Sequence, residues 1–177
     1  MKFFEPNLEK ISLLQYLYVL FLKKFHHLGY RKKVCGVIID SKGNFLVDQL
    51  VGYGQNQWNF PGGGIDQGET AKEALLRELY EELGSRDFKI IRESKIISRY
   101  EWPNSVIIKR LKEKKELFRG QSASHFLVKY LGDKEKLQPD PGEIRKIKWI
   151  KRGEFEKYFV FPGQFEETIK IFKDLKI

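Results

Sequence analysis

The sequence has few of the residues that build disulfides or soft-ligand metal sites. It contains one cysteine and three histidines among 177 residues. The single cysteine, Cys35, excludes an internal disulfide framework and any cysteine-cluster metal site. Because two of the three histidines are the adjacent pair His26 and His27, little remains for a histidine-based zinc site. Any divalent metal ion would therefore have to bind to carboxylates.

The sequence also lacks an apolar run long enough to cross a membrane. The longest run, residues 11–22, is followed directly by Lys23 and Lys24, whereas a bilayer span needs about 20 apolar residues. No basic region precedes the run and no small-residue cleavage site follows it, so we expect no secretory signal and a cytoplasmic protein. Residues from about 7 to 27 instead predict a helix that Asn7 caps and Gly29 ends.

Apolar residues cover most of the circumference of this N-terminal helix, which predicts burial on more than one side. Three arrangements are open: packing on the following domain, contact with a second copy in a homodimer, or an in-plane membrane helix. Packing on the domain is favoured, and membrane association is not expected. The basic residues that would meet lipid headgroups in the third case are Lys23, Lys24, Arg31, Lys32 and Lys33.

The overall charge is basic, since 33 Lys and Arg residues against 24 Asp and Glu residues give a formal net charge of +9. This excess favours anionic partners such as nucleic acids, nucleotides or membrane surfaces, although a lysine-rich surface can also serve solubility alone. A composition of 41% hydrophobic and 32% charged residues is typical of a globular protein. The length predicts one domain with a modest appendage.

The order of apolar segments predicts an α+β domain, residues 29–177, after a helical extension, residues 1–28. Thr70 and Glu73 form a capping box at the start of a central helix, and Gly84 supplies its end. Residues 106–108 extend a predicted strand, and we expect residues 109–119 to form a charged connection. The predicted strands are residues 34–39, 45–47, 58–60, 88–100, 124–131 and 143–150, and the predicted helices are 70–83, 152–158 and 164–175.

The central helix has one apolar face and one acidic face. At roughly 100° per residue, the side chains of Glu78, Glu81 and Glu82 gather opposite the apolar ones. Like charges four residues apart, and acids near a helix C-terminus, both destabilise a helix. This face therefore either meets water or binds a cation such as Mg²⁺ or Mn²⁺. Arg77 can pair with Glu81. The apolar face holds Leu75, Leu76, Leu79, Tyr80 and Leu83.

A glycine-rich loop precedes this helix. Pro61 is followed by three consecutive glycines, residues 62–64, which bring bare backbone against the start of the helix. Backbone groups in such a loop can approach a phosphate or a metal ion. Glu69 stands at the end of the loop, directed toward the same region.

These residues together resemble a known motif. Gly63, Glu69 and the run RELYEELG at residues 77–84 match the Nudix box, G-x5-E-x7-R-E-U-x-E-E-x-G-U, where U is a bulky apolar residue. Only the last position differs, because Ser85 replaces an apolar residue outside the metal-binding positions. The chain resembles the Nudix hydrolases from about residue 29 to residue 173.

The resemblance implies an α/β/α sandwich with a mixed sheet, and hydrolysis of a phosphoanhydride in a nucleoside diphosphate linked to another group. It also implies about one to three Mg²⁺ or Mn²⁺ ions, which would neutralise the polyphosphate and lower the pKa of a bound water. By position, Glu78 and Glu82 are the central ligands. Supporting roles fall to Glu69, Glu81, the Gly63 carbonyl and, as the group that orients the glutamates, Arg77.

Residues outside the box resemble the bacterial RNA 5′-pyrophosphohydrolases, which also hydrolyse dinucleoside polyphosphates. In that group an extra acid, here Glu143, completes the metal site or serves as a base; the alternative is a surface ion pair with Lys146 or Arg145. Phe161 would stack a base, unless it belongs to the core. The resemblance gives four further candidate substrate contacts, Arg31, Arg99, Tyr100 and Gln121, and for Arg99 a structural salt bridge is an equal alternative.

The sequence therefore predicts a Mg²⁺-dependent Nudix pyrophosphohydrolase of 5′-triphosphorylated RNA or dinucleoside polyphosphates. The alternatives are a pyrophosphatase of NTPs, ADP-ribose or nucleotide sugars, and a non-catalytic Nudix-like module that binds RNA or protein. A basic excess beside a metal-loaded acidic face favours nucleotides or RNA 5′ ends over duplex DNA. The loop at residues 50–54 lacks the arginine expected in the RNA-specific group, which weakens the case for strict RNA specificity.

Overall fold

The computed structural model describes residues 12–25 and 27–177. The chain forms two compact units. The first unit comprises Met1–Lys32 and Ser98–Ser122, and the second unit comprises Lys33–Ile97 and Ala123–Ile177. The Nudix-box residues all belong to the second unit.

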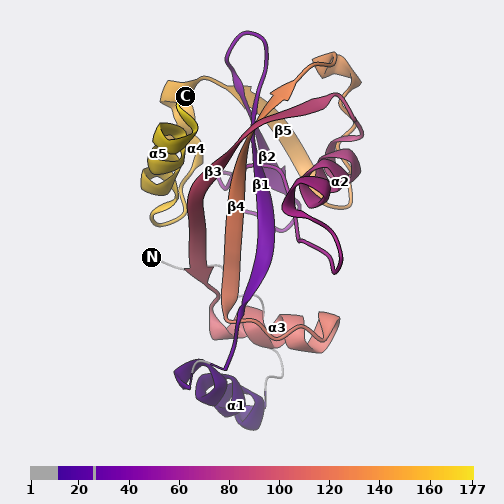
Figure 1. Cartoon of the computed structure of the whole chain (residues 1–177). Helices are drawn as coiled ribbons and strands as arrows, with labels where there is room; N and C mark the ends of the chain where they lie inside the picture. Colours follow the sequence, from indigo (N-terminus) through magenta and orange to yellow (C-terminus); the bar gives the residue numbers. More distant parts are fainter. Residues whose placement is uncertain (1–11, 26) are drawn as a thin grey trace. The chain divides into compact units, whose positions relative to one another are not determined.

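A five-stranded mixed sheet organises the chain, with the strand order β3-β4-β1-β2-β5 (Figure 1). β1 and β2 form an antiparallel hairpin, in which Ile38 lies opposite Leu46, and β5 pairs antiparallel with β2. The predicted α+β class with a mixed sheet is confirmed. The strands are β1 (Tyr30–Ile39), β2 (Phe45–Leu50), β3 (Phe88–Glu101), β4 (Gly120–Tyr130) and β5 (Ile144–Ile150).

Helices cover both faces of the sheet in the second unit, which explains the near-continuous apolar run in β1. On one face, Val34 and Ile38 pack with the leucines of α2 (Ala71–Leu83). On the other, Val37 packs with α4 (Phe155–Tyr158) and α5 (Gln164–Leu175) through Phe155 and Phe172. Figure 1 shows α2 on one side of the strands and α4 and α5 on the other. Two short 3₁₀ helices, η1 (Lys134–Lys136) and η2 (Arg152–Glu154), complete this unit.

Both predicted ends of the central helix are confirmed. The Thr70 hydroxyl oxygen accepts the backbone N–H of Glu73 at 3.3 Å, and the Glu73 carboxylate accepts the backbone N–H of Thr70 at 2.8 Å. Gly84 ends the helix in the left-handed region, with φ of +67°, which a glycine adopts without steric cost. These local interactions fix where the acidic face begins and ends.

Replacing Thr70 with Ala is expected to lower the free energy of unfolding by about 1 kcal/mol, because the helix loses its N-cap acceptor. Chemical denaturation of the two proteins measures this difference. Lys72→Ala is the matched control, since Lys72 is exposed in the first turn of the same helix. Equal unfolding midpoints for Thr70→Ala and wild type would contradict the capping role.

In the first unit, α1 (Leu13–Lys24) packs on α3 (Asn104–Lys114). Val19 is buried against Trp102, Ile107 and Ile108. The residues that the structure describes give α1 no other buried side chain, so the prediction of burial on more than one side is wrong. The reason is that α3 covers one side of the helix only. Among the helices described, none has the length and apolarity needed to span a bilayer.

Two further predictions concern these helices. α1 begins at Leu13 with Ser12 as its cap and ends at Lys24, and the predicted cap at Asn7 lies outside the described residues. The strand extension at 106–108 and the charged connection from 109 are wrong, because residues 104–114 form α3. Ile107 and Ile108 find an apolar partner in Val19, and such tertiary packing overrides a weak local pattern.

Candidate active site

Carboxylates from the loop and from α2 surround the guanidinium of Arg77. Arg77 Nη2 and Nε donate to the two oxygens of Glu69 at 2.6 and 3.1 Å. Its Nη1 donates to Glu78 at 3.0 Å and to Glu81 at 2.9 Å, and its Nη2 also donates to the Gly64 carbonyl at 3.0 Å. Arg77 thus orients three glutamates at once, which supports the orienting role implied by the motif. Its hydrogen bond also holds the pKa of Glu69 below its usual range.

Glu82 is the buried member of the acidic face, with 5% of its surface exposed. Its Oε2 accepts the backbone N–H of Gly62 at 2.7 Å. Burial raises the pKa of Glu82 to about 7, and the negative charges of Glu78 and Glu143 act in the same direction. A buried acid of this kind holds a proton near neutral pH unless a cation replaces it.

Glu78 lies against the glycine loop. A Cβ atom added to Gly63 would stand 2.0 Å from Glu78 Oε2, so the carboxylate occupies the space that only a glycine leaves open. Burial raises the pKa of Glu78 as well. The Gly63 carbonyl accepts the Val34 backbone N–H at 2.9 Å, which fixes the loop on β1. That carbonyl retains a second lone pair.

Gly62 is required by the backbone itself. Its φ is +129°, and an added Cβ would stand 2.4 Å from the carbonyl oxygen of Val34. A side chain is excluded on both grounds. Glycines at positions 62 and 63 therefore have different tasks: the first permits the path of the loop, and the second leaves room for Glu78.

A polar environment behind Glu82, which the sequence analysis missed, consists of the buried residues Asp48 and His125 and the half-buried Lys33. Asp48 on β2 is 1% exposed, and its pKa is raised well above the usual range by burial and then by the charge of Glu82. The charge of Lys33 acts on both acids in the opposite direction. Burial, and then Lys33, lowers the pKa of His125 to about 4. The available signal was polar residues inside the apolar strands FLVDQL and SHFLV.

Glu143 is exposed immediately before β5. Its charge raises the pKa of both Glu78 and Glu82. Within the described residues it forms no ion pair with Lys146 or Arg145, since Arg145 donates to the carbonyls of Val51 and Tyr53 instead. The surface ion-pair alternative is therefore not supported, and Glu143 acts electrostatically on the acidic face.

Four of the five predicted substrate contacts belong to the first unit. The Tyr100 hydroxyl hydrogen-bonds to Gln121 Oε1, so these two are brought together. Arg31 pairs with Glu116 at 3.9 Å. The guanidinium carbon of Arg99 lies 6.0 Å from the centre of the Tyr30 ring. Phe161, in the second unit, is half-buried and packs edge-on to Tyr53 with ring centres 5.4 Å apart. Substrate contact by these residues stays a prediction.

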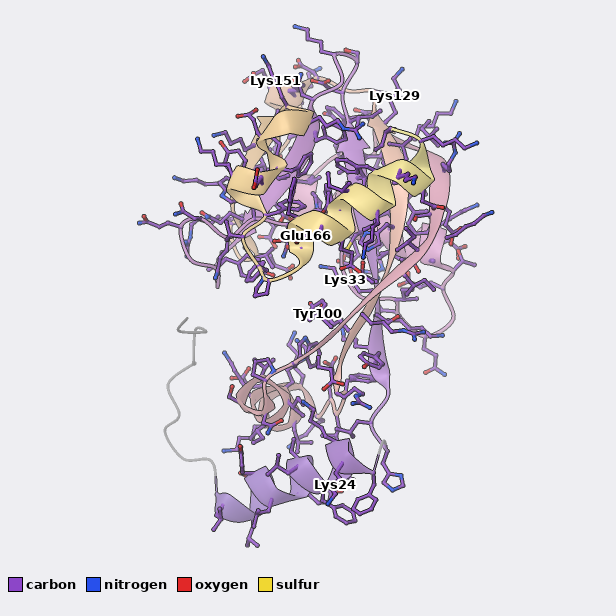
Figure 2. All side chains as sticks on the ribbon, turned by 90° about the vertical axis from the view of Figure 1, so that its left-hand side faces the viewer. Lys24, Lys33, Tyr100, Lys129, Lys151 and Glu166 are labelled. Carbon is purple, nitrogen blue, oxygen red and sulfur yellow. The ribbon has the colours of Figure 1, made fainter. Side chains whose placement is uncertain are left out.

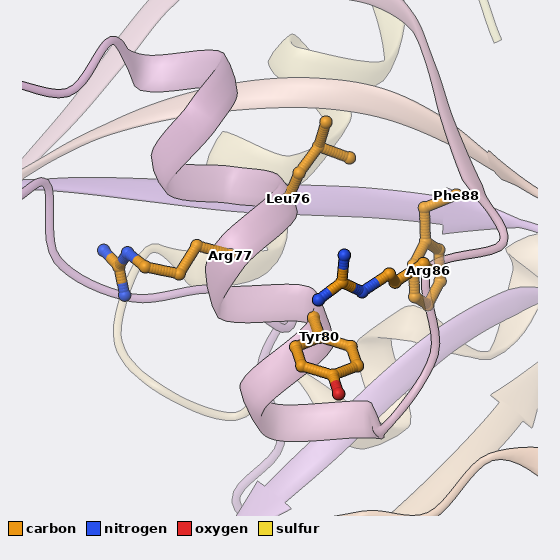
Figure 3. Close-up of a pocket in the computed structure, with 5 residues that line it drawn as sticks. All are labelled: Leu76, Arg77, Tyr80, Arg86 and Phe88. Atoms are coloured by element: carbon orange, nitrogen blue, oxygen red, sulfur yellow. The ribbon is translucent and has the colours of Figure 1, made fainter.

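A groove of about 380 Å³ adjoins α2 (Figure 3). Leu76 and Tyr80, at the edge of the apolar helix face, are 43% and 45% exposed and line it. The Arg86 guanidinium lies 4.4 Å from the centre of the Tyr80 ring. The groove is lined by Leu76, Arg77, Tyr80, Arg86 and Phe88. Arg77 therefore borders both the groove and the acidic face.

The donor chemistry of the acidic face fits a divalent cation. Glutamate oxygens and a backbone carbonyl are the hard ligands that Mg²⁺ and Mn²⁺ prefer. Burial raises the pKa of both Glu78 and Glu82, with smaller contributions from neighbouring negative charges, and a bound cation would favour their charged forms. In the described part of the chain, no three His, Cys, Asp or Glu side chains converge on one point. The carboxylates are instead arranged around the positive charge of Arg77.

Comparison with known proteins gives a family and a fold. The family model for the NUDIX domain matches residues 29–169. An RNA pyrophosphohydrolase of Mannheimia succiniciproducens is 40% identical over 111 residues, which cover 62% of this chain and 54% of that protein. An RNA pyrophosphohydrolase of Vibrio vulnificus is 39% identical over 127 residues, covering 69% of this chain and 71% of that protein. The chain thus matches about half the length of the first relative.

Among solved structures, the C. elegans Ap4A hydrolase binary complex has a similar fold. The TM-score is 0.61 at 21% sequence identity, and the match covers 82% of this chain and 98% of that one. At this identity the likeness concerns the fold alone. It agrees with the layered arrangement of helices on both faces of the sheet.

Proposed function

Because this chain belongs to the Nudix family, we propose that it is a pyrophosphohydrolase of 5′-triphosphorylated RNA ends or dinucleoside polyphosphates. The observation that carries the proposal is the complete acidic face of α2, held by Arg77 against the glycine loop. The relatives named for RNA pyrophosphate hydrolysis support the first substrate class. A non-catalytic module would not need to retain every glutamate of the motif. The proposed location is the cytoplasm, where such RNA ends are made.

Nudix hydrolases generally use divalent metal ions such as Mg²⁺. We assign Glu78 and Glu82 as the central ligands, with Glu69, Glu81, Glu143 and the Gly63 carbonyl in supporting positions. A bound ion would neutralise polyphosphate charge and make a water molecule more acidic. The number of ions, about one to three, belongs to the same proposal.

The chain's own residues position this chemistry. The Gly62 N–H fixes one oxygen of Glu82, which leaves its second oxygen for a ligand. Arg77 spaces Glu69, Glu78 and Glu81 by hydrogen bonds of defined geometry. Glu143, exposed yet coupled electrostatically to Glu78 and Glu82, completes the ligand set or accepts a proton from the attacking water.

The proposed stacking partner for a base is Phe161. The proposed contacts to nucleotide or phosphate are Arg31, Arg99, Tyr100 and Gln121. Base stacking on an aromatic face tolerates any base. A single-stranded RNA end offers both unstacked bases and phosphates, so it satisfies these contacts better than duplex DNA does.

A substrate panel with Mg²⁺ tests the proposal. The panel contains triphosphorylated RNA, diadenosine tetraphosphate, ADP-ribose, a nucleotide sugar and NTPs. We expect kcat/KM for one of the first two to exceed the others by at least about 10-fold, or 1.4 kcal/mol of transition-state stabilisation. Comparable values on every compound, or a preference for ADP-ribose or NTPs, would contradict the substrate assignment. Reactions with excess chelator serve as the metal-free control.

A further inference from the structure

The first unit exposes an apolar helix face. Six residues of α1 and its C-terminal cap are at least half exposed, with values from 50% for Leu17 to 78% for Leu14. At roughly 100° per residue they span an arc of about 140°. We call this set the outer face of α1: Leu13, Leu14, Leu17, Tyr18, Phe21 and Phe25. Figure 2 shows side chains projecting from this helix, with Lys24 labelled.

The opposite side of α1 holds the helix in place. Val19 is completely buried against Trp102, Ile107 and Ile108. Lys23 Nζ donates to the Trp102 carbonyl at 3.1 Å and pairs with Glu101 at 3.4 Å. These contacts hold the buried side of α1 against α3. The outer face therefore has no apolar partner within the pair formed by α1 and α3. A fixed, contiguous apolar surface of this kind marks an interaction site.

The charge of the same unit identifies the chemistry of the partner. The first unit has 13 basic and 5 acidic residues, so it carries +8 of the chain's formal charge of +9. Residues 12–32 include four basic residues and no acidic one. The partner must therefore offer apolar material and negative charge together. An anionic lipid surface supplies both, through its acyl chains and its headgroups.

We propose that the outer face of α1 binds an anionic lipid bilayer in the plane of its interface, with lysines of the first unit at the headgroups. Phe and Tyr rings beside Lys residues are suited to this depth. A second copy of this unit would bring two charges of +8 together, which opposes pairing. The arc of the outer face contains a single cation, Lys24, so it offers a nucleic acid little positive charge. The proposal is independent of the proposed function.

The test is co-sedimentation of the full chain with phosphatidylcholine vesicles that contain about 30% phosphatidylglycerol. At equal lipid concentration, the bound fraction gives a partition coefficient for each vesicle type. We expect this coefficient to be at least about 10-fold higher for the vesicles with phosphatidylglycerol than for pure phosphatidylcholine vesicles. Binding should weaken as the salt concentration rises from about 50 to about 500 mM, because salt screens the headgroup attraction. Absence of binding to both vesicle types would overturn the proposal.

The double variant Leu14→Glu/Phe21→Glu is expected to lower the partition coefficient at least about 10-fold, because charged groups resist burial in the bilayer. The matched control is Ile97→Glu/Leu131→Glu, at residues of the second unit that are 52% and 60% exposed, and it should bind as wild type does. Circular dichroism melting checks folding, and the milder Leu14→Ser/Phe21→Ser variant should show a smaller loss. Equal losses in the test and control variants would contradict a role of α1. A different result would assign the outer face to a second copy of the chain. In that case wild type would dimerise as its concentration rises and would not bind vesicles, and Leu14→Glu/Phe21→Glu would abolish the dimer.

Discussion

Replacing Glu82 with Gln is expected to lower kcat by at least about 100-fold, because the variant loses a ligand charge that no neighbour can supply. Folding should survive, since Gln keeps the side-chain oxygen that accepts the Gly62 N–H. The measurement is steady-state hydrolysis of triphosphorylated RNA or diadenosine tetraphosphate at saturating Mg²⁺. Glu156→Gln, at an exposed position of α4, is the matched control and should retain full activity. Wild-type activity in Glu82→Gln would contradict the assignment of the metal site.

When metal ions are removed, the same variant is expected to be more stable than wild type. The pKa of Glu82 is about 7 in the folded chain, above the 4.5 of an unperturbed glutamate. The folded state therefore binds more protons than the unfolded state between these values, and stability falls as pH rises through this window. Without metal, Glu82→Gln should exceed wild type in unfolding free energy by up to about 3 kcal/mol at pH 8.

This difference should vanish below about pH 4.5, where Glu82 is protonated in both states. Added Mg²⁺ should stabilise wild type more than the variant, because binding to the folded state alone adds to its stability. Denaturant titrations in chelator and in Mg²⁺ at several pH values give these quantities. If Glu82→Gln were less stable than wild type at pH 8 in chelator, the ionised Glu82 carboxylate would not destabilise the folded chain.

Replacing Gly63 with Ala is expected to lower kcat/KM by at least about 100-fold with little loss of stability. The added Cβ would meet Glu78 Oε2 at 2.0 Å, and the end of a flexible side chain can move aside. Glu78 then leaves the position that Arg77 Nη1 and the loop define, and a displacement of about 1 Å is enough to cost 100-fold in rate. Kinetics and denaturation on the same protein separate the two effects.

Two other glycines act as controls for that variant. Gly52→Ala should behave as wild type, because an added Cβ there meets nothing within 4 Å. Gly62→Ala should instead lose stability, since its φ of +129° and the Val34 carbonyl at 2.4 Å both oppose a side chain. If Gly63→Ala lost stability as Gly62→Ala does and kept its activity per folded molecule, Gly63 would serve the loop and not Glu78.

The acidic helix was predictable because its determinants are local. The Thr70–Glu73 box, the terminal Gly84 and the spacing of the glutamates lie within about four turns of helix, and helical periodicity alone places the carboxylates on one face. The strands of the second unit were also predicted, from the near-continuous apolar run in β1 and from the alternating pattern in β3. The predicted strand at residues 58–60 is wrong, because Asn59 forms only an isolated bridge with Asp48. Local sequence was sufficient wherever the structure depends on local interactions.

The features that the sequence did not predict depend instead on contacts between residues distant in the chain. α3 depends on Ile107 and Ile108 meeting Val19, a contact more than 80 residues away in the chain, so its own charged sequence gave a weak helical pattern. Asp48 and His125 come from different strands and meet the field of Lys33 or Glu82 only after the sheet forms. The exposure of α1 likewise follows from how much of it α3 covers, which no hydrophobic pattern specifies.

The most direct test of the proposed activity uses triphosphorylated RNA radiolabelled at its γ-phosphate. We predict that wild type with Mg²⁺ releases the label in one of two ways from otherwise intact RNA. Release as pyrophosphate leaves a 5′-monophosphate, whereas release as phosphate leaves a 5′-diphosphate that a second hydrolysis converts to the monophosphate. Chelator, or the substitution Glu78→Gln, should abolish the release. Label release at the wild-type rate by Glu78→Gln would contradict a pyrophosphohydrolase built on the acidic face of α2. Failure of wild type to hydrolyse either this RNA or unlabelled diadenosine tetraphosphate would contradict it as well.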